Sequence, residues 1–275
     1  MPEPSEHTEY LDGLPIFWRE APAPDAEAAL PPVLYLHGVP TNADDWTAWL
    51  ALTGGVAVDL PGFGRSGKPG SLSYTIEEYD AFIERFLDWR GLERVRLVMH
   101  DWGGVGLAFA QRRPERVRRM VLINVVPFLP GYRWHRTARI WRTPGLGELA
   151  MGATVSFTLK HLSREANVTP GPLPEDMRRS VIDHLDQGTQ RAILRLYRSS
   201  PPERLAAAGA HLGDVHAPTL VAWGTADPYI PAHFGRDYAN AFPDAELLEL
   251  PDAGHWAWLD RPDLPERVHE FLARG

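Results

Sequence analysis

Residues 97–104 read LVMHDWGG, and this stretch decides the fold of the 275-residue chain. An apolar strand runs into Asp101, and the small residues Gly103 and Gly104 then open a helix that the spacing predicts over 105–111. A sharp strand-to-helix turn of this kind displays one side chain at the end of a sheet, and Asp101 occupies the displayed position. The alternative interpretation is that Asp101 only caps the helix that follows.

Apolar runs with the length of buried strands lie on both sides of this stretch, and helix-spaced segments alternate with them. In residues 75–89, for example, the apolar side chains form one stripe, which predicts an amphipathic helix. This alternation predicts an α/β fold in which helices cover both faces of a mostly parallel central sheet. The predicted strands are residues 33–36, 56–60, 95–99, 120–123, 219–223 and 246–250.

The alternation stops between residues 127 and 213. Helical stretches such as 177–185 and 189–197 are separated there by prolines, and no buried strand is evident. We therefore predict a helical insertion over residues 127–213, which interrupts a main domain composed of residues 1–126 and 214–275.

Composition limits the classes of function. The net charge of −8 argues against nucleic acid as the main partner. The chain has no cysteine, and none of its histidines falls in a recognised metal-ligand spacing, so we expect no metal site. No apolar run approaches the roughly 20 residues of a membrane span, and residues 1–10 show no secretory signal. The cytoplasm is therefore the expected compartment, and the sequence leaves the oligomeric state open.

Two polar residues follow later strands in the order that a catalytic triad has in a sheet of this kind, the acid before the base. Asp227 follows the strand at 219–223, and His255 follows the strand at 246–250. Because the carboxyl ends of parallel strands meet at one edge of a sheet, we expect both side chains near Asp101. Taken alone, the first is also consistent with a turn residue before a proline, and the second with a loop residue after a glycine.

Acyl chemistry at this edge also needs N–H donors for a developing oxyanion. The motif HGVP at 37–40 follows the first buried strand, and the backbone N–H groups of Val39 and Trp102 are the candidate donors. A backbone donor works with any side chain, so a valine is acceptable there. We interpret His37 as a structural residue.

These motifs together resemble the α/β-hydrolase superfamily and, within it, the group of epoxide hydrolases and haloalkane dehalogenases that use an aspartate nucleophile. The resemblance implies an α/β-hydrolase fold with a helical cap inserted in the main domain, which matches the predicted insertion. The stretches that carry it are HGVP (37–40), DLPGFGRS (59–66), HDWGG (100–104), GTADPYIP (224–231) and DAGHW (252–256).

A carboxylate is a suitable nucleophile because its reference pKa of about 3.9 leaves it ionised at neutral pH. We expect Asp101 to displace a leaving group at a saturated carbon and form an alkyl-enzyme ester. His255 would then deprotonate the water that attacks this ester, while Asp227 orients the imidazole. This chemistry requires no metal and no organic cofactor.

The first expectation for the reaction is hydrolysis of an epoxide to a vicinal diol. Epoxide hydrolases open the ring with tyrosines of the cap, and Leu196-Tyr197-Arg198 resembles the segment that carries one of them. A phenol with a pKa of about 10 is a suitable proton donor to a developing alkoxide. The alternative is that Tyr197 packs inside the insertion. The second tyrosine of the family has no match, because Tyr132 lies too near the start of the insertion.

The alternative reaction, with the same triad, is hydrolysis of a carbon–halogen bond. The resemblance implies that the tryptophan after the nucleophile, here Trp102, holds the halide together with a second Trp or Asn. The matching residue of HGVP is a valine without a donor, so the remaining candidates are Trp46, Trp49, Trp134 and Trp141. A third interpretation, a hydrolase-fold protein that binds a small molecule without turnover, leaves a complete triad unexplained.

Aromatic residues of the insertion and of the main domain are expected to enclose a small apolar organic substrate. The alternative for each is ordinary core packing. The candidate pocket residues are Trp102, Phe128, Trp134, Trp141, Phe157 and Trp256.

Overall fold

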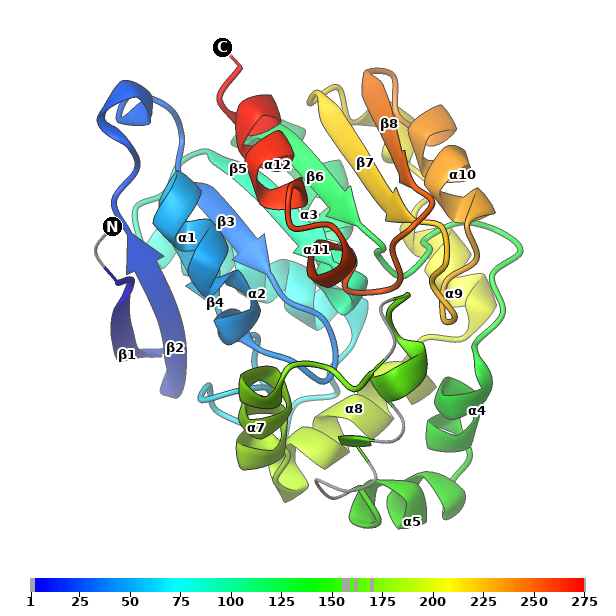
Figure 1. Ribbon diagram of the computed structural model, residues 1–275. Helices are drawn as coiled ribbons and strands as arrows, with labels where there is room; N and C mark the ends of the chain where they lie inside the picture. Colours follow the sequence, from blue (N-terminus) through cyan, green and yellow to red (C-terminus); the bar gives the residue numbers. More distant parts are fainter. Residues whose placement is uncertain (1–2, 155–158, 161–162, 169–170, 275) are drawn as a thin grey trace.

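The computed structural model describes residues 3–154, 159–160, 163–168 and 171–274, and its centre is an eight-stranded sheet (Figure 1). The strand order is β1-β2-β4-β3-β5-β6-β7-β8. β1 and β2 form an antiparallel hairpin, β2 is antiparallel to β4, and the other neighbours are parallel. The predicted α/β fold with a mostly parallel sheet is therefore confirmed. The strands are β1 (Ser5–Leu11), β2 (Leu14–Ala21), β3 (Val33–Leu36), β4 (Gly55–Val58), β5 (Val95–His100), β6 (Val117–Ile123), β7 (Thr219–Gly224) and β8 (Ala245–Leu250).

Helices cover both faces of this sheet. Apolar side chains of α2, α3 and α10 are buried against one face, and those of α1 and α12 against the other. Because the central strands are buried on both faces, β3, β4 and β7 are apolar along almost their whole length. The helices of this part are α1 (Thr47–Thr53), α2 (Ile76–Trp89), α3 (Gly106–Arg112), α10 (His233–Ala241), α11 (Ala257–Asp260) and α12 (Leu264–Leu272).

The start of α2 is fixed by two reciprocal hydrogen bonds. The Thr75 hydroxyl accepts from the Glu78 N–H at 3.3 Å, and the Glu78 carboxylate accepts from the Thr75 N–H at 3.3 Å. This capping box satisfies two N–H groups that a helix leaves without partners at its start. The buried stripe that follows packs α2 on the sheet, as its spacing predicts.

In the described part of the chain between β6 and β7, every regular element is a helix. Figure 1 shows α4, α5, α7 and α8 grouped at the end of the sheet toward which the parallel strands point. Catalytic sites of open α/β sheets form at this end. The division into an insertion over 127–213 and a main domain stays a prediction. The helices of this part are α4 (Arg136–Arg142), α5 (Leu146–Gly152), α7 (Glu175–His184), α8 (Gln187–Ser199) and α9 (Pro202–Ala208).

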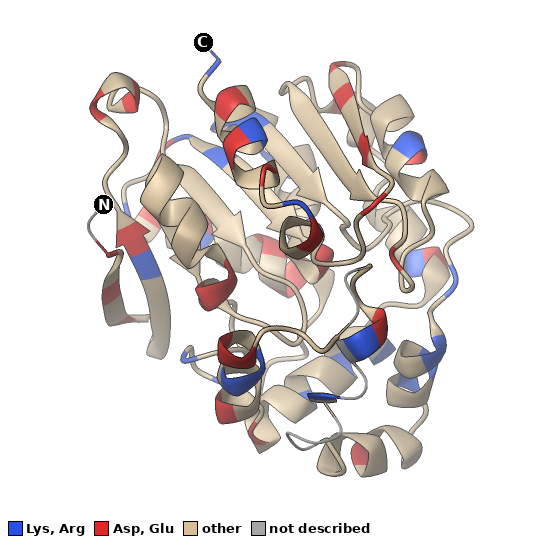
Figure 2. Cartoon of the chain, viewed as in Figure 1, with Lys and Arg blue, Asp and Glu red and all other residues tan. Residues whose placement is uncertain are grey.

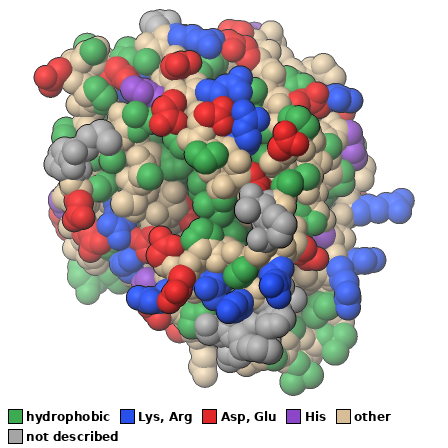
Figure 3. All heavy atoms as spheres, in the orientation of Figure 1, with side chains coloured by type: hydrophobic (Ala, Val, Ile, Leu, Met, Phe, Trp, Pro, Cys, Tyr) green, Lys and Arg blue, Asp and Glu red, His purple; other side chains and the backbone are tan. Residues whose placement is uncertain are grey.

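Charged residues lie mainly on the outer helices, the loops and the β1–β2 hairpin, while the middle of the sheet is largely free of them (Figure 2). On the face shown in Figure 3, side chains of both signs are interspersed with apolar ones. Within the described part of the chain, no helix has the length and apolar character needed to cross a membrane.

We predict that Thr75→Ala lowers the free energy of unfolding by about 1 kcal/mol, because the start of α2 loses its hydroxyl acceptor. Urea denaturation of the purified protein measures this change. Thr75→Ser keeps a hydroxyl at the same position and should unfold close to the wild type. Equal stability of the alanine variant and the wild type would contradict the role of this cap.

Candidate active site

Asp101 lies at a sharp corner between β5 and the 3-10 turn η3 (Asp101–Val105), which leads into α3. Its φ of +48° lies in the left-handed region, which costs energy for a residue other than glycine. Gly103 makes the corner possible, because a Cβ there would stand 2.1 Å from the Leu36 carbonyl oxygen. His100, not Asp101, occupies the capping position of the turn, so the interpretation of Asp101 as only a helix cap is wrong.

The Asp101 carboxylate is buried and held by the loop after β3. The Val39 backbone N–H donates to Oδ2 at 2.8 Å. Burial raises the pKa of Asp101, against the opposing effects of the His255 charge and of the N–H groups of Val39 and Trp102. A Cβ at Gly38 would stand 2.6 Å from the Asp101 Cβ, so only glycine permits this close approach. Both N–H groups expected at an oxyanion hole therefore act on the Asp101 carboxylate.

His255 stands between two carboxylates. Its Nδ1 lies 2.7 Å from Asp227 Oδ2, and its Nε2 lies 3.8 Å from Asp101 Oδ1. Burial lowers the pKa of His255, but the charges of Asp227 and Asp101 outweigh this and raise it above its ordinary value. The three residues predicted to meet at this edge of the sheet are thus in contact.

Asn124, at the end of β6, was not expected in the site. Its Nδ2 donates to Asp227 Oδ2 at 2.8 Å and to the Gly224 carbonyl at 3.0 Å, and its Oδ1 accepts from the Gly224 N–H at 2.8 Å. The backbone N–H groups of Tyr229 and Ile230 hold the other oxygen of the carboxylate, at 2.7 and 3.1 Å. Asn124 therefore fixes Asp227 from the neighbouring strand. A polar residue directly after a buried strand is the signal that points to it.

Two further histidines support this arrangement without charge. His100 Nε2 lies 3.0 Å from the His255 carbonyl oxygen, and burial together with the His255 charge holds the pKa of His100 well below its ordinary value. His37 Nε2 accepts from the Leu60 N–H at 3.0 Å, and burial lowers the pKa of His37 to about 4. Both rings serve the structure, as expected for His37.

An aromatic group from residues 127–213 covers Trp102, the residue that follows Asp101. The ring of Trp134 stacks on Trp102 with centroids 5.6 Å apart, and the Tyr197 ring meets Trp102 edge-on at 5.3 Å. Tyr132 meets Trp134 at 5.1 Å. Burial raises the pKa of both tyrosines, and the charge of Asp101 adds to this rise. The position of Tyr132 near the start of the insertion argues against it as the second tyrosine of the family, but the structure packs its ring on Trp134.

Two N–H or O–H donors of this group are buried without a hydrogen-bond partner in the described structure, the Trp102 indole and the Tyr132 hydroxyl. The Trp102 N–H is close enough to the Tyr197 oxygen to oppose the rise of the tyrosine pKa, but no hydrogen bond of ordinary geometry forms. An unsatisfied buried donor costs about 1–3 kcal/mol. Such donors beside a buried carboxylate favour a site that binds an electronegative atom.

The other candidate pocket residues lie at different distances from this centre. The Trp256 ring packs 4.7 Å from the His255 ring, and Trp141 meets Tyr197 at 5.0 Å. Phe128 belongs to the large apolar cluster that also contains Trp102, and its N–H donates to the Tyr238 hydroxyl at 2.7 Å. No described ring contact joins Phe128 to the aromatic group on Trp102. Phe157 lies outside the described residues.

The first-loop tryptophans do not contact Trp102 and cannot complete a halide site with it. Trp46 and Trp49 pack with Tyr35 and Trp258 on the opposite face of the sheet. Among the described residues, no group of three or more His, Asp or Glu side chains is arranged to hold a metal ion.

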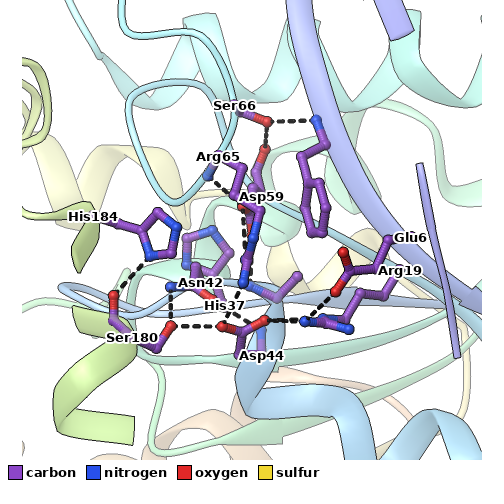
Figure 4. Close-up of polar contacts among 12 residues, drawn as sticks. Glu6, Arg19, His37, Asn42, Asp44, Asp59, Arg65, Ser66, Ser180 and His184 are labelled. Carbon is purple, nitrogen blue, oxygen red and sulfur yellow. Dashed lines mark hydrogen bonds and ion pairs between the residues drawn. The ribbon is translucent and has the colours of Figure 1, made fainter. Parts of the chain in front are cut away.

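A charged network fastens the loop after β3 to the insertion (Figure 4). Asp44 accepts from Arg19 and Arg65 at 2.9 Å each, and from the hydroxyl of Ser180 in α7 at 2.6 Å. Burial acts against these hydrogen bonds, but they lower the pKa of Asp44 to about 2. Asn42 adds a second bond to Ser180 at 2.9 Å. The loop that supplies the Val39 donor is therefore held from both sides.

The chain is similar to known proteins over most of its length. A family model described as alpha/beta hydrolase fold matches residues 31–262. A haloalkane dehalogenase of Bradyrhizobium diazoefficiens is 28% identical over 91% of this chain and 88% of that protein. One of Mesorhizobium japonicum is 29% identical over 87% of this chain and 83% of that protein. The crystal structure of the haloalkane dehalogenase DbeA from Bradyrhizobium elkani aligns with a TM-score of 0.83 at 25% identity, covering 98% of both chains.

Proposed function

Since this chain belongs to the α/β-hydrolase fold family and is an enzyme of that fold, we propose that it hydrolyses haloalkanes through an alkyl ester on Asp101. The geometry of the Asp101 carboxylate carries the proposal. One oxygen accepts from the Val39 N–H, and the other faces His255 Nε2 at 3.8 Å and is free of this bond. The unpartnered indole N–H of the next residue, Trp102, supplies a donor for a departing halide.

In the first step, Asp101 Oδ1 attacks the carbon that carries the halogen. A carbon–oxygen bond forms, the carbon–halogen bond breaks, and the halogen leaves with the bonding electron pair as halide. Oδ2 then becomes the carbonyl oxygen of the ester and already lies at the Val39 N–H. The oxyanion donors are thus in place before the second step begins.

In the second step, His255 Nε2 takes a proton from water, and the hydroxide adds to the carbonyl carbon of Asp101. Negative charge develops on Oδ2 and is stabilised by the backbone donors. The intermediate collapses by releasing the alcohol oxygen, which takes up a proton, and the carboxylate of Asp101 is restored. Asp227 stabilises the imidazolium through its 2.7 Å contact with Nδ1. The net products are an alcohol, a halide and a proton.

Ester formation also changes the pKa of His255. In the resting enzyme the charge of Asp101 contributes to the raised pKa of His255. Esterification removes this charge, so the pKa of His255 falls just when a neutral imidazole is required. The same carboxylate therefore acts as nucleophile in one step and releases the base for the next.

Epoxide hydrolysis, the first expectation from the sequence, is the second candidate. Relatives named haloalkane dehalogenase favour carbon–halogen bonds. One observation still supports the epoxide: Tyr197 packs on Trp102, the residue after Asp101, and Tyr132 packs on Trp134 in the same aromatic group. Phenols in this group are suitable proton donors to an alkoxide. Both reactions share the ester on Asp101 and the second step.

The insertion over residues 127–213 would act as a cap over a main domain of residues 1–126 and 214–275. Trp134 and Tyr197 come from this segment and lie against Trp102. Aromatic walls of this kind suit a small apolar organic substrate. Trp141 and Trp256 would extend the wall, on the far side of Tyr197 and beside His255 respectively.

We expect His255→Gln to form the ester and to stop there, because glutamine cannot deprotonate water. Incubation with 1-bromohexane should release one bromide per enzyme and leave a stable hexyl adduct on Asp101, seen by intact-protein and peptide mass spectrometry. His216→Gln changes an exposed histidine and is the matched control, which should turn over like the wild type.

Styrene oxide is the parallel substrate in this experiment. We expect the bromoalkane to give both bromide and an adduct, and we expect styrene oxide to give no adduct. If only styrene oxide gives an adduct, the substrate class is the epoxide and the haloalkane proposal is wrong. A wild type that turns over either compound while the glutamine variant never carries an adduct would contradict the ester mechanism.

The pH dependence of the second step should differ from the titration of the resting enzyme. Hydrolysis needs neutral His255, so its rate should rise with pH through the pKa of the imidazole in the ester. That pKa should lie below the one measured for His255 in the free enzyme by NMR, because the Asp101 charge is gone. Single-turnover decay of the ester at a series of pH values measures it. A midpoint at or above the free-enzyme value would refute the charge effect.

A further inference from the structure

His255 belongs to a connection, residues 251–256, that forms neither helix nor strand between β8 and α11. Asp227 fixes the rotation of the imidazole through Nδ1. The distance from Nε2 to Asp101 also depends on where the backbone of this connection lies. The packing around residues 251–256 therefore bears directly on the second step.

Both backbone groups of His255 are bound by other parts of the chain. Its carbonyl oxygen lies 3.0 Å from His100 Nε2, next to the nucleophile. Its N–H donates at 2.7 Å to the carbonyl oxygen of Ala166, a residue of the insertion. The backbone of His255 is thus hydrogen-bonded on one side to His100, at the end of β5, and on the other side to a short segment of the insertion, Ala166–Val168.

Asp260, in α11, joins this segment to the connection. Its Oδ2 accepts from the Gly254 N–H at 2.9 Å, from the Val168 N–H at 3.0 Å and from Asn167 Nδ2 at 2.9 Å. Asn167 Nδ2 also lies 2.9 Å from the Trp256 carbonyl oxygen. Hydrogen bonds to an ionised acceptor are among the stronger ones in proteins. One carboxylate oxygen therefore binds the residue before His255 and two residues of the insertion.

The surfaces also fit closely. A Cβ at Gly254 would stand 2.3 Å from the Ala166 carbonyl oxygen and 2.7 Å from the Asn167 Cα. Ala166 is fully buried and packs with Leu173 and Trp256 in a small apolar cluster of its own. Figure 1 shows this part of the insertion reaching up to the connection that precedes α11.

We propose that Asn167 and Asp260 are positioning residues for the catalytic base, which clamp residues 166–168 onto the connection 251–256 and so set His255 Nε2 over the Asp101 ester. The proposal rests on the proposed function, because it concerns the step in which His255 acts. Neither side chain contacts the nucleophile or the covering aromatic group through a described hydrogen bond.

This placement separates the two chemical steps. Ester formation uses the Asp101 carboxylate and the donors around the leaving atom, and none of these is held by Asn167 or Asp260. Hydrolysis uses His255 Nε2, whose position depends on the clamp. A misplacement of about 1 Å costs up to about 100-fold in rate when a reacting group must be aligned. Loss of the clamp should therefore slow only the second step.

The test compares Asn167→Ala and Asp260→Ala with the wild type in rapid-mixing reactions with 1-bromohexane. Bromide release in the first turnover reports ester formation, and the decay of the hexyl adduct by mass spectrometry reports hydrolysis. We expect adduct decay to slow by about 10- to 100-fold while first-turnover bromide release keeps its rate. The amplitude of that release counts active enzyme, so partial unfolding is separated from slow hydrolysis.

Asp263→Ala is the matched control. Asp263 lies three positions further along, and its carboxylate forms an exposed pair with Arg261 at 2.9 Å. Its removal should leave both steps at the wild-type rate. Wild-type adduct decay in both clamp variants, or an equal slowing of both steps, would overturn the positioning role. Absence of any adduct even in His255→Gln would contradict the proposed function itself, together with the clamp.

Discussion

The 2.8 Å hydrogen bond from the Val39 N–H to the Asp101 carboxylate is the contact on which the rest of the site depends. It requires β3 and the corner after β5 to approach more closely than side chains usually permit. Glycines at 38 and 103 allow this approach. A Cβ at Gly38 would collide with Asp101, and a Cβ at Gly103 would collide with the Leu36 carbonyl. The backbone of Asp101 adopts a left-handed conformation at this corner, and the side chain carries its carboxylate at the end of the sheet.

Near this corner, a series of hydrogen bonds fixes the other residues of the site. β6 supplies Asn124, which holds Asp227, and Asp227 holds His255. Under the proposed mechanism, the nucleophile, the acid and the base thus follow β5, β7 and β8 at one end of the sheet. Burial makes these groups costly to charge, and their mutual contacts are what keep a carboxylate and a basic imidazole together inside the protein.

The chain between β6 and β7 does more than cover this centre. Asp44 and Asn42 tie Ser180 of α7 to the loop that carries the Val39 donor. On the opposite side, Ala166 receives the N–H of His255. The oxyanion donor and the base are therefore each attached to the same insertion. Under the proposed mechanism, the position of residues 127–213 is consequently part of the catalytic geometry.

Much of this could be predicted from the sequence, because strand ends carry local signals. Asp101, Asp227 and His255 each follow an apolar run, and their order restricts the fold. Tyr132 and Asn124 could not be assigned in the same way, since their roles arise from contacts between segments distant along the chain. Spacing even argued against Tyr132, because distance along the insertion does not report distance in space.

The preference between substrates could not be decided from these signals either. The Tyr197-Arg198 pair favoured an epoxide, whereas the relatives from Bradyrhizobium diazoefficiens and Mesorhizobium japonicum are named haloalkane dehalogenase. Both leaving groups require donors above the same carboxylate, and the site offers an indole N–H and two phenols. The local sequence shows which residue types could donate, but it does not show where these donors lie relative to a leaving atom.

The most direct measurement follows the oxygen atom. With enzyme in excess over 1-bromohexane in water labelled with heavy oxygen, we expect the first-turnover alcohol to carry unlabelled oxygen from Asp101. The label should instead appear in the peptide that contains Asp101, because water attacks the carbonyl carbon of the ester. Labelled alcohol with an unlabelled Asp101 would mean that water attacks the substrate directly, and would contradict the covalent role of this carboxylate.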